Sequence, residues 1–143
     1  MFSAPCEFIL ENEQDSKALA QKIATNLKLH DVLAFTGDLG AGKSFFCREI
    51  IKSLCGQQIN VISPTFNLLQ IYESKNFSIY HFDLYRLKHQ SEVYELGIEE
   101  AFDSALSLIE WPEIIGEILP KGSIFVDIKI ISDSSRRVSI RKD

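Results

Sequence analysis

The most informative segment of this chain is the run of eight residues from Gly37 to Ser44, Gly-Asp-Leu-Gly-Ala-Gly-Lys-Ser. A glycine, four further residues, Gly-Lys and then Ser or Thr form the pattern of a P-loop, which binds the phosphates of nucleotides. Its glycines let successive backbone N–H groups curl around a phosphate chain. Lys43 can reach the terminal phosphates, and the hydroxyl of Ser44 can coordinate magnesium. We therefore expect the chain to bind a nucleoside triphosphate, or something very like one, with magnesium.

The residues around the P-loop predict the strand and the helix that this motif requires. The apolar run 32–36 is typical of a strand and leads directly into the loop. After the loop, Phe46, Ile50 and Leu54 recur at helical spacing, and Gly56 is suited to end the helix. The N-terminus of such a helix adds a partial positive charge that favours phosphate. The alternative is an ordinary glycine-rich turn, which the combination of motif and context disfavours.

Hydrolysis of a bound nucleotide needs a carboxylate near the magnesium ion, a group that positions water and a sensor of the γ-phosphate. Glu110 is the first candidate carboxylate. It follows the apolar run 105–109, the position of a Walker B acid, and Pro112 stops the strand just beyond it. Because strands commonly end in an acidic residue, an ordinary charged residue at a strand end is the alternative.

Asp83 is the second candidate carboxylate. In the segment 77–84, the two-residue period of a strand places Ile79, His81 and Asp83 on one face. An aspartate near a strand end can orient water or share the magnesium site. The alternatives are a structural partner for Arg86 and a cap for the next segment. His81 by itself is more typical of a packed or hydrogen-bonded strand residue than of a catalytic base.

Thr65 lies in the sequence Ser-Pro-Thr-Phe at 63–66 and is a candidate nucleotide sensor. Its hydroxyl or N–H group can meet the γ-phosphate or its magnesium ion, as a switch threonine does. A simple turn is the alternative, because Ser-Pro often starts one. Trp111 can close over the site or serve as a core residue. No arginine stands in a recognisable arginine-finger context, so we expect slow hydrolysis by the isolated chain; the candidates are Arg48, Arg86, Arg136 and Arg137.

The pattern of apolar residues predicts a single α/β domain over residues 1–143. We expect a P-loop NTPase-like three-layer domain, with parallel strands around the P-loop and antiparallel hairpins attached to a mixed sheet. The other expected elements are a short strand at 6–10, a helix capped by Asp15 or Ser16 and running to about 29, a short strand at 59–62, a hairpin of 66–73 and 77–84, helical pieces over 91–104 interrupted near Gly97, and a second hairpin of 123–131 and 136–141.

The overall composition narrows the function further. A net charge of −5 disfavours a protein that grips nucleic acid unaided, because neutralising phosphates needs clustered Lys and Arg. No apolar run approaches the length of a membrane span, and the first sixteen residues hold no Lys or Arg for a signal peptide. The three cysteines lack metal-binding spacing and fit reduced thiols. We expect a cytoplasmic protein that acts on, or with, another protein.

Taken together, the motifs resemble those of the TsaE (YjeE) ATPases, bacterial proteins needed for threonylcarbamoyl modification of the adenosine beside the anticodon of tRNAs. The strings at 81–86 and 110–112 are far more specific than the P-loop. Ser44 stands where threonine is common in the family, and it keeps the magnesium-binding hydroxyl. The matching strings follow in order along almost the whole chain: the P-loop at 37–44, Ser-Pro-Thr-Phe at 63–66, His-Phe-Asp-Leu-Tyr-Arg at 81–86, Glu-Leu-Gly-Ile at 95–98 and Leu-Ile-Glu-Trp-Pro at 108–112.

The resemblance implies a role for each motif. Ser44 and Glu110 would hold magnesium, Thr65 would lie in the nucleotide-sensing segment, and Asp83 would support hydrolysis. The adenine would lie near the start of the first helix, around Ser16, and near Arg137 in the C-terminal hairpin. The phosphates of ATP would be held by Asp38, Leu39, Gly40, Ala41, Gly42, Lys43 and Ser44, with Lys43 also neutralising charge during hydrolysis.

The resemblance also implies partners. Family members act with the TsaB–TsaD pair, and ATP hydrolysis would reset that complex, while tRNA would be met only through the complex. A small-molecule kinase and a nucleotide-dependent switch are the alternatives. No Arg-rich lid follows the P-loop, which disfavours the kinase. No Asn-Lys-x-Asp motif occurs, and no Asp-x-x-Gly motif occurs outside the P-loop, which disfavours a GTP switch.

Overall fold

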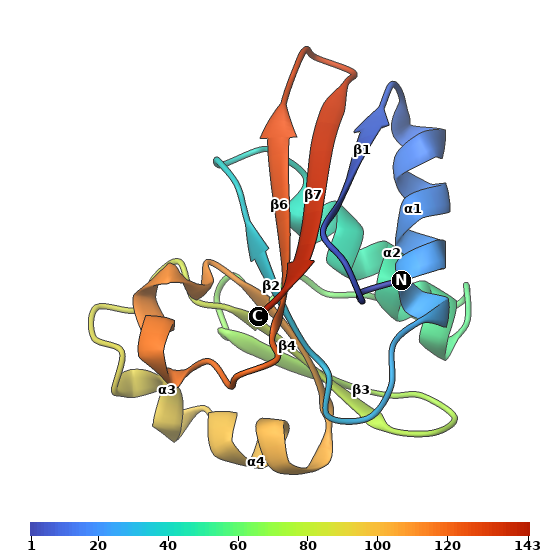
Figure 1. The fold of residues 1–143 in the computed structure, drawn as a ribbon. Coiled ribbons are helices and arrows are strands. Elements are labelled where there is room, and N and C mark those ends of the chain that lie inside the picture. The colour runs from blue at the N-terminus through green and yellow to red at the C-terminus, as the bar shows by residue number, and fades with distance from the viewer.

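The structure, a computed structural model that describes residues 1–143, is built on one seven-stranded mixed sheet (Figure 1). The strands lie in the order β1-β7-β6-β2-β5-β4-β3. The four central strands β6, β2, β5 and β4 run parallel, and β1, β7 and β3 pair antiparallel at the two edges. The strands span β1 Cys6–Leu10, β2 Val32–Thr36, β3 Leu69–Glu73, β4 Ser78–Asp83, β5 Leu106–Glu110, β6 Ile124–Ile130 and β7 Arg136–Lys142.

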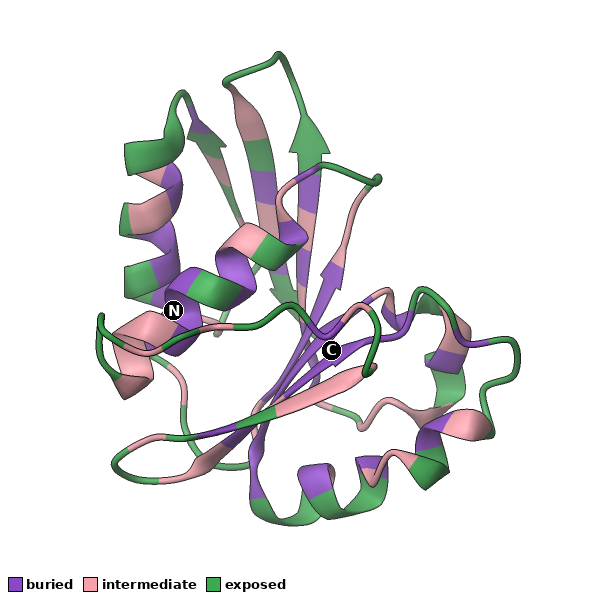
Figure 2. Cartoon of the chain, turned by 180° about the vertical axis from the view of Figure 1, so that it is seen from behind, coloured by how far each residue is buried: buried purple, intermediate pink, exposed green.

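Helices cover both faces of the sheet, because the central strands are apolar on both sides. Leu33 and Phe35 of β2 pack with α1 and α2, whereas Val32 packs with α3 and α4 on the opposite face. Strand β5 is accordingly buried along its whole length, and β2 is buried in all but its last residue (Figure 2). This confirms the expected three-layer α/β architecture. The helices span α1 Glu13–Thr25, α2 Lys43–Cys55, α3 Glu92–Glu95, α4 Ile98–Ser104 and the 3-10 helix η1 Pro112–Ile118.

The first helix begins and ends earlier than the sequence predicts. Asn12 is its N-cap: its side-chain oxygen accepts a hydrogen bond of 2.9 Å from the backbone N–H of Asp15. Asp15 and Ser16 therefore lie inside the first turn and do not cap it. Asn26 ends the helix, since its N–H group bonds to carbonyls of the last turn. The second helix agrees with its prediction, because it begins at Lys43 and is followed by Gly56 at a φ of 113°.

The prediction of a strand at 59–62 is wrong. This segment pairs with no strand of the sheet; instead, the Tyr72 hydroxyl of β3 bonds to both the N–H and the carbonyl of Ile62, at 2.9 and 3.1 Å. The first hairpin is present but shorter than expected. A turn closed by the Leu68 N–H and the Pro64 carbonyl occupies its first residues, so that β3 starts at Leu69.

The remaining predictions about the elements are confirmed. β6 and β7 form the C-terminal hairpin, and Gly97, at a φ of 82°, separates α3 from α4. None of the helices combines the length and the apolar character that crossing a membrane requires.

Candidate functional site

The parallel strands bring the candidate residues to one edge of the sheet. β2 ends at Thr36 and passes into the glycine-rich loop 37–42, while β4 ends at Asp83 and β5 ends at Glu110. Asp83 and Glu110 are directly paired in the register of β4 and β5, and Glu110 is also paired with Phe35 of β2. Because the carboxyl ends of parallel strands meet at one edge, both acids lie beside the loop and the start of α2.

The glycine-rich loop needs its glycines for conformation and for space. Gly37, Gly40 and Gly42 have φ values of 142°, 82° and 115°, a region that other residues rarely adopt. A Cβ on Gly37 would also collide with the carbonyl oxygen of Ile128 on β6. A side chain at this position would thus force the loop away from the sheet.

Glu110 joins the start of α2 to strand β4. Its Oε1 accepts a hydrogen bond of 2.7 Å from the Ser44 hydroxyl, and its Oε2 lies 2.7 Å from Nε2 of His81. Both Glu110 and His81 are only 2% exposed. An ionised carboxylate only accepts hydrogen bonds, so the Nε2 of His81 carries the proton and donates. Glu110 therefore has both oxygens held in fixed directions.

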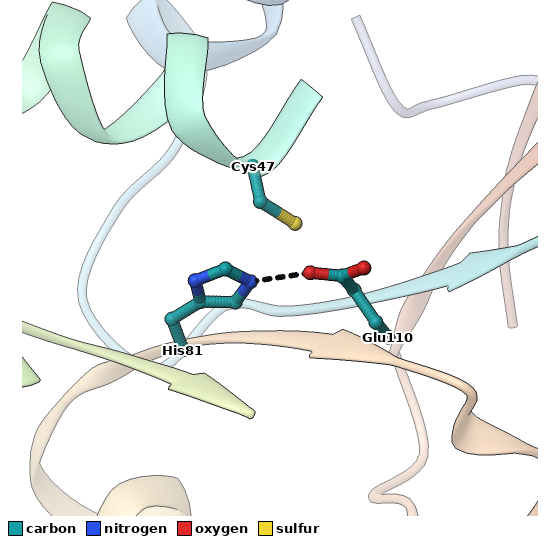
Figure 3. Close-up of side chains that lie close together, drawn as sticks. All are labelled: Cys47, His81 and Glu110. Atoms are coloured by element: carbon teal, nitrogen blue, oxygen red, sulfur yellow. Dashed lines mark hydrogen bonds and ion pairs between the residues drawn. The ribbon is translucent and has the colours of Figure 1, made fainter. Parts of the chain in front are cut away.

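His81 is hydrogen-bonded in its strand, as its sequence context favours, but its specific partner could not be predicted. The alternation in β4 places His81 and Asp83 on one face, and only the register with β5 shows that this face meets Glu110. Cys47 of α2 points toward the same pair (Figure 3). Burial raises the pKa of the Cys47 thiol well above its usual value, and the neighbouring charge of Glu110 adds to that effect.

Lys43 lies between backbone carbonyls and an aromatic ring. Its Nζ donates hydrogen bonds to the carbonyl oxygens of Gly37 and Asp38, the latter at 3.0 Å, and lies 4.0 Å from the centre of the Trp111 ring. Burial lowers the pKa of Lys43, while the charges of Glu110 and of more distant acids partly offset this. The ammonium group thus lies next to the loop and is partly shielded from water.

Trp111 lies over the lysine, so it is part of the site and not only of the core. Its backbone is in the left-handed region, with φ 59° and ψ 53°, directly after β5 and before Pro112. Its ring also packs against Tyr85, with ring centres 4.9 Å apart. A residue other than glycine in this conformation is held there by its surroundings, and such strain is common at functional sites.

Asp83 contacts the segment that carries Thr65. Its Oδ2 accepts a hydrogen bond of 3.4 Å from the Thr65 hydroxyl, and its Oδ1 accepts one of 3.2 Å from the Tyr85 N–H. Burial raises the pKa of Asp83; the bond from Tyr85 opposes this effect, and the charge of Glu110 adds to it. Arg86 is not its partner, because the Arg86 guanidinium lies 4.7 Å from the centre of the Phe66 ring.

A cavity of about 380 Å³ opens where these groups converge. Trp111 and Arg86, which the sequence raised as candidates, also line it, and so do Phe45 and Tyr85, for which the sequence predicted no role. Most of the predicted site residues line it: Leu39, Gly40, Gly42, Lys43, Ser44, Thr65, Asp83 and Glu110.

A second cavity of about 390 Å³ adjoins the first and shares Gly42 and Phe45 with it. It lies between the start of α1 and the turn from β6 to β7, where Ser16 and Arg136 line it together with Ala41. The Arg136 Nε donates a hydrogen bond of 2.9 Å to the Ala41 carbonyl.

The structure does not bring Arg137 into this cavity, contrary to the expectation. Successive residues of a strand point to opposite faces, and Arg137 faces away, with its Nε 3.6 Å from a carboxylate oxygen of Glu7 on β1. Arg136 occupies the position expected for Arg137. The larger cavity of about 590 Å³, between Cys6 of β1, Phe125 of β6 and Arg141 of β7, contains none of the predicted site residues.

The fold and the glycine-rich loop define the class of this protein, which is the α/β class with a P-loop NTPase-like fold. The structure matches the crystal structure of Bacillus subtilis YdiB with a TM-score of 0.78 and 31% sequence identity, over 95% of this chain and 84% of that one. This similarity confirms the predicted fold.

The family follows from the sequence comparisons. A family model described as threonylcarbamoyl adenosine biosynthesis protein TsaE matches residues 10–138. The Rickettsia typhi protein TsaE is 54% identical over 134 residues, which are 94% of this chain and 93% of the relative. The Bacillus subtilis TsaE is 36% identical over 129 residues, which are 90% of this chain and 80% of the relative. The chain belongs to the TsaE family of tRNA threonylcarbamoyladenosine biosynthesis.

Proposed function

We propose that this chain binds ATP with magnesium, hydrolyses it slowly, and acts with the TsaB–TsaD complex in threonylcarbamoyl modification of the adenosine beside the anticodon of tRNAs. One observation carries the proposal. Lys43, Ser44, Asp83 and Glu110 converge on a cavity at the carboxyl ends of parallel strands, in direct contact with the N-terminus of α2. This is where an open α/β sheet binds its ligand.

The phosphates of ATP would lie against the glycine-rich loop. Its N–H groups and the N-terminus of α2 favour an anion, and Lys43 would move its ammonium from the carbonyls of Gly37 and Asp38 onto the β- and γ-phosphates. Burial lowers the pKa of Lys43, and the negative charge of an approaching phosphate opposes this effect by stabilising the ammonium form.

Ser44 and Glu110 fit a magnesium ion, because their hydroxyl and carboxylate oxygens are 2.7 Å apart and magnesium prefers oxygen ligands. The ion would neutralise charge on the phosphates when bound. His81 keeps the second carboxylate oxygen of Glu110 engaged, which fixes the orientation of the first.

Asp83 would hold the attacking water and accept its proton. Its carboxylate lies next to Glu110 and lines the cavity, and a raised pKa makes it a better proton acceptor than an ordinary aspartate. Thr65 would sense the γ-phosphate, and its hydrogen bond to Asp83 would pass a movement of the segment 63–66 to the water-binding group.

The adenine would enter the second cavity, beside Ser16. Arg136 would take the place that we had expected for Arg137, because its hydrogen bond to Ala41 ties β7 to the phosphate-binding loop.

We expect slow hydrolysis by the isolated chain because no arginine is positioned to compensate the charge that develops on the phosphates. Arg86 is the arginine that lines the phosphate cavity, but its guanidinium lies on the Phe66 ring. The TsaB–TsaD complex would stimulate turnover by contacting the mouth of this cavity. Exposed apolar side chains there fit a protein partner: Leu39 and Phe66 are 73% and 79% exposed. The net charge of −5 fits contact with tRNA only through the complex.

The test combines calorimetry and turnover. With magnesium, ATP should bind the purified chain, and Lys43→Ala should abolish productive ATP use. Adding purified TsaB–TsaD should raise the rate of phosphate release by the unaltered chain. If no purine triphosphate binds, the enzymatic proposal is wrong; if the rate is the same with and without TsaB–TsaD, the partner-coupled part is wrong.

A further inference from the structure

Three side chains of different chemistry meet directly beneath the cavity. Cys47 of α2, His81 of β4 and Glu110 of β5 each place one donor atom within 4.8 Å of the other two (Figure 3). All three are buried, with Cys47 fully inaccessible to solvent. His81 and Glu110 bond to one another, whereas the Cys47 sulfur has no hydrogen-bond partner among them.

The donor set differs from a magnesium site. Magnesium prefers oxygen ligands, whereas a thiol sulfur and an imidazole nitrogen together with one carboxylate are the ligands of zinc and of softer cations such as cadmium. Charge also favours this class, because a thiolate and a carboxylate supply two negative charges that a divalent cation neutralises inside the protein.

We propose that Cys47, His81 and Glu110 bind a divalent cation of the zinc class, with the sulfur, Nε2 and one carboxylate oxygen as ligands. Binding replaces the His81–Glu110 hydrogen bond by two metal bonds. The thiol loses its proton to solvent, and His81 binds through a deprotonated Nε2 after its proton moves to the unpartnered Nδ1. The fourth position of the metal is left for water.

The geometry requires only small movements. Ligand atoms around tetrahedral zinc lie about 3.5 Å apart, given metal–ligand bonds of about 2.0–2.3 Å, so donors that are now up to 4.8 Å apart must approach by about 1.3 Å at most. Nε2 of His81 and the Glu110 oxygen, now 2.7 Å apart, must separate slightly. Glu110 lines the cavity and offers the entry path. Nδ1 of His81 has no buried partner to fix the ring, so we expect an exchangeable site and not a structural one.

One consequence rests on the proposed function. A zinc-class cation on one oxygen of Glu110 would neutralise the carboxylate and repel a magnesium ion at the other oxygen, so we expect it to weaken magnesium binding and inhibit ATP use. Stoichiometric Zn²⁺ should then weaken magnesium-dependent ATP binding in the unaltered chain but not in Cys47→Ser. Equal inhibition of both proteins would overturn this competition.

The site itself is tested without nucleotide, so that its outcome is independent of ATP binding. Cd²⁺ is titrated into the chain carrying Cys6→Ser and Cys55→Ser, which removes the two half-buried thiols, and the sulfur-to-cadmium absorption band is followed in the ultraviolet. We expect one equivalent of Cd²⁺ to produce the band, and adding Cys47→Ser to abolish it. Adding His81→Asn should weaken binding at least about tenfold.

Circular dichroism identifies which variants are folded, and Cys47→Ala replaces Cys47→Ser if the latter does not fold. The variant with only Cys6 and Cys55 replaced and its counterpart with Cys47 also substituted decide the matter together. If it is folded and shows no band with Cd²⁺, or if the band persists after the substitution of Cys47, the proposed site does not exist.

Discussion

The buried hydrogen bond between His81 and Glu110 gives a stability prediction that does not depend on any ligand. The bond is 2.7 Å long, and both side chains are 2% exposed. A hydrogen bond to a charged group contributes about 1.5–3 kcal/mol, and removing one partner leaves the other buried and unpaired. We expect His81→Leu to destabilise the fold by about 3 kcal/mol, because an unpaired buried charge costs about 3–5 kcal/mol and Ser44 still binds the other oxygen of Glu110.

A double-mutant cycle separates this bond from the packing that each substitution disturbs. We would measure the free energy of unfolding in urea, with a chelator and without nucleotide, for His81→Leu, Glu110→Met and the double variant. The double variant should be more stable than the sum of the single effects predicts, by about 1.5–3 kcal/mol. For a chain of this length, that corresponds to roughly 5–10 °C in melting temperature.

The same strand provides a control pair. The Ser78 hydroxyl bonds to an oxygen of Glu73 at 2.8 Å, but on the exposed hairpin, where water replaces a lost bond. The cycle of Ser78→Ala and Glu73→Ala should give a coupling of about 0.5 kcal/mol or less. If the buried pair couples no more strongly than this exposed pair, Glu110 is not held by His81, and our account of the orientation of Glu110 is wrong.

Three further substitutions or ligands test the site. Burial raises the pKa of Asp83, so ionisation of this carboxyl lowers the stability of the fold once the pH rises above the pKa of an ordinary aspartate. Asp83→Asn should therefore abolish hydrolysis but raise the melting temperature at pH 7 in metal-free buffer, by a margin that shrinks toward pH 4. A lower melting temperature at pH 7 would contradict this. Arg136→Ala should weaken ATP binding about tenfold in calorimetry, whereas Arg137→Ala should leave it nearly unchanged; equal effects would reject our placement of the adenine. Trp111 is the only tryptophan, and ATP should change its fluorescence by drawing Lys43 away from its ring. If ATP changes the fluorescence of Lys43→Ala to the same extent, movement of the lysine is not the cause of the change.

The fold and most of the phosphate cavity could be predicted because the motifs follow the strands that position them. Glu110 ends an apolar run and Asp83 lies near the end of a predicted strand, and parallel strands bring such ends to one edge. The segment 59–62 misled the prediction, since four residues with a strand-like composition form no strand without a neighbour to pair with. A side chain from β3, Tyr72, satisfies that backbone instead.

The side chains at the site that the sequence misplaced or left without a role depend on which face of a strand meets which helix. The alternation of a strand puts neighbours such as Arg136 and Arg137 on opposite sides, but it does not tell which side faces the phosphate-binding loop. The antiparallel pairing of β7 with β1 and β6 places Arg137 between Ile9 and Lys129, and its side chain lies on the face where it meets Glu7.

The same dependence explains why His81 was not assigned a role, although its strand and its face were predicted. His81 is paired with Leu108 in the register of β4 and β5, and its side chain reaches Glu110, two residues further along β5. This register is fixed because both faces of the sheet are buried. A shift by one residue would turn His81 away from the α1–α2 side and bring Phe82 into its place, next to Cys47. The apolar residues of β4 thus fix the face from which His81 reaches the carboxylate that we propose for magnesium.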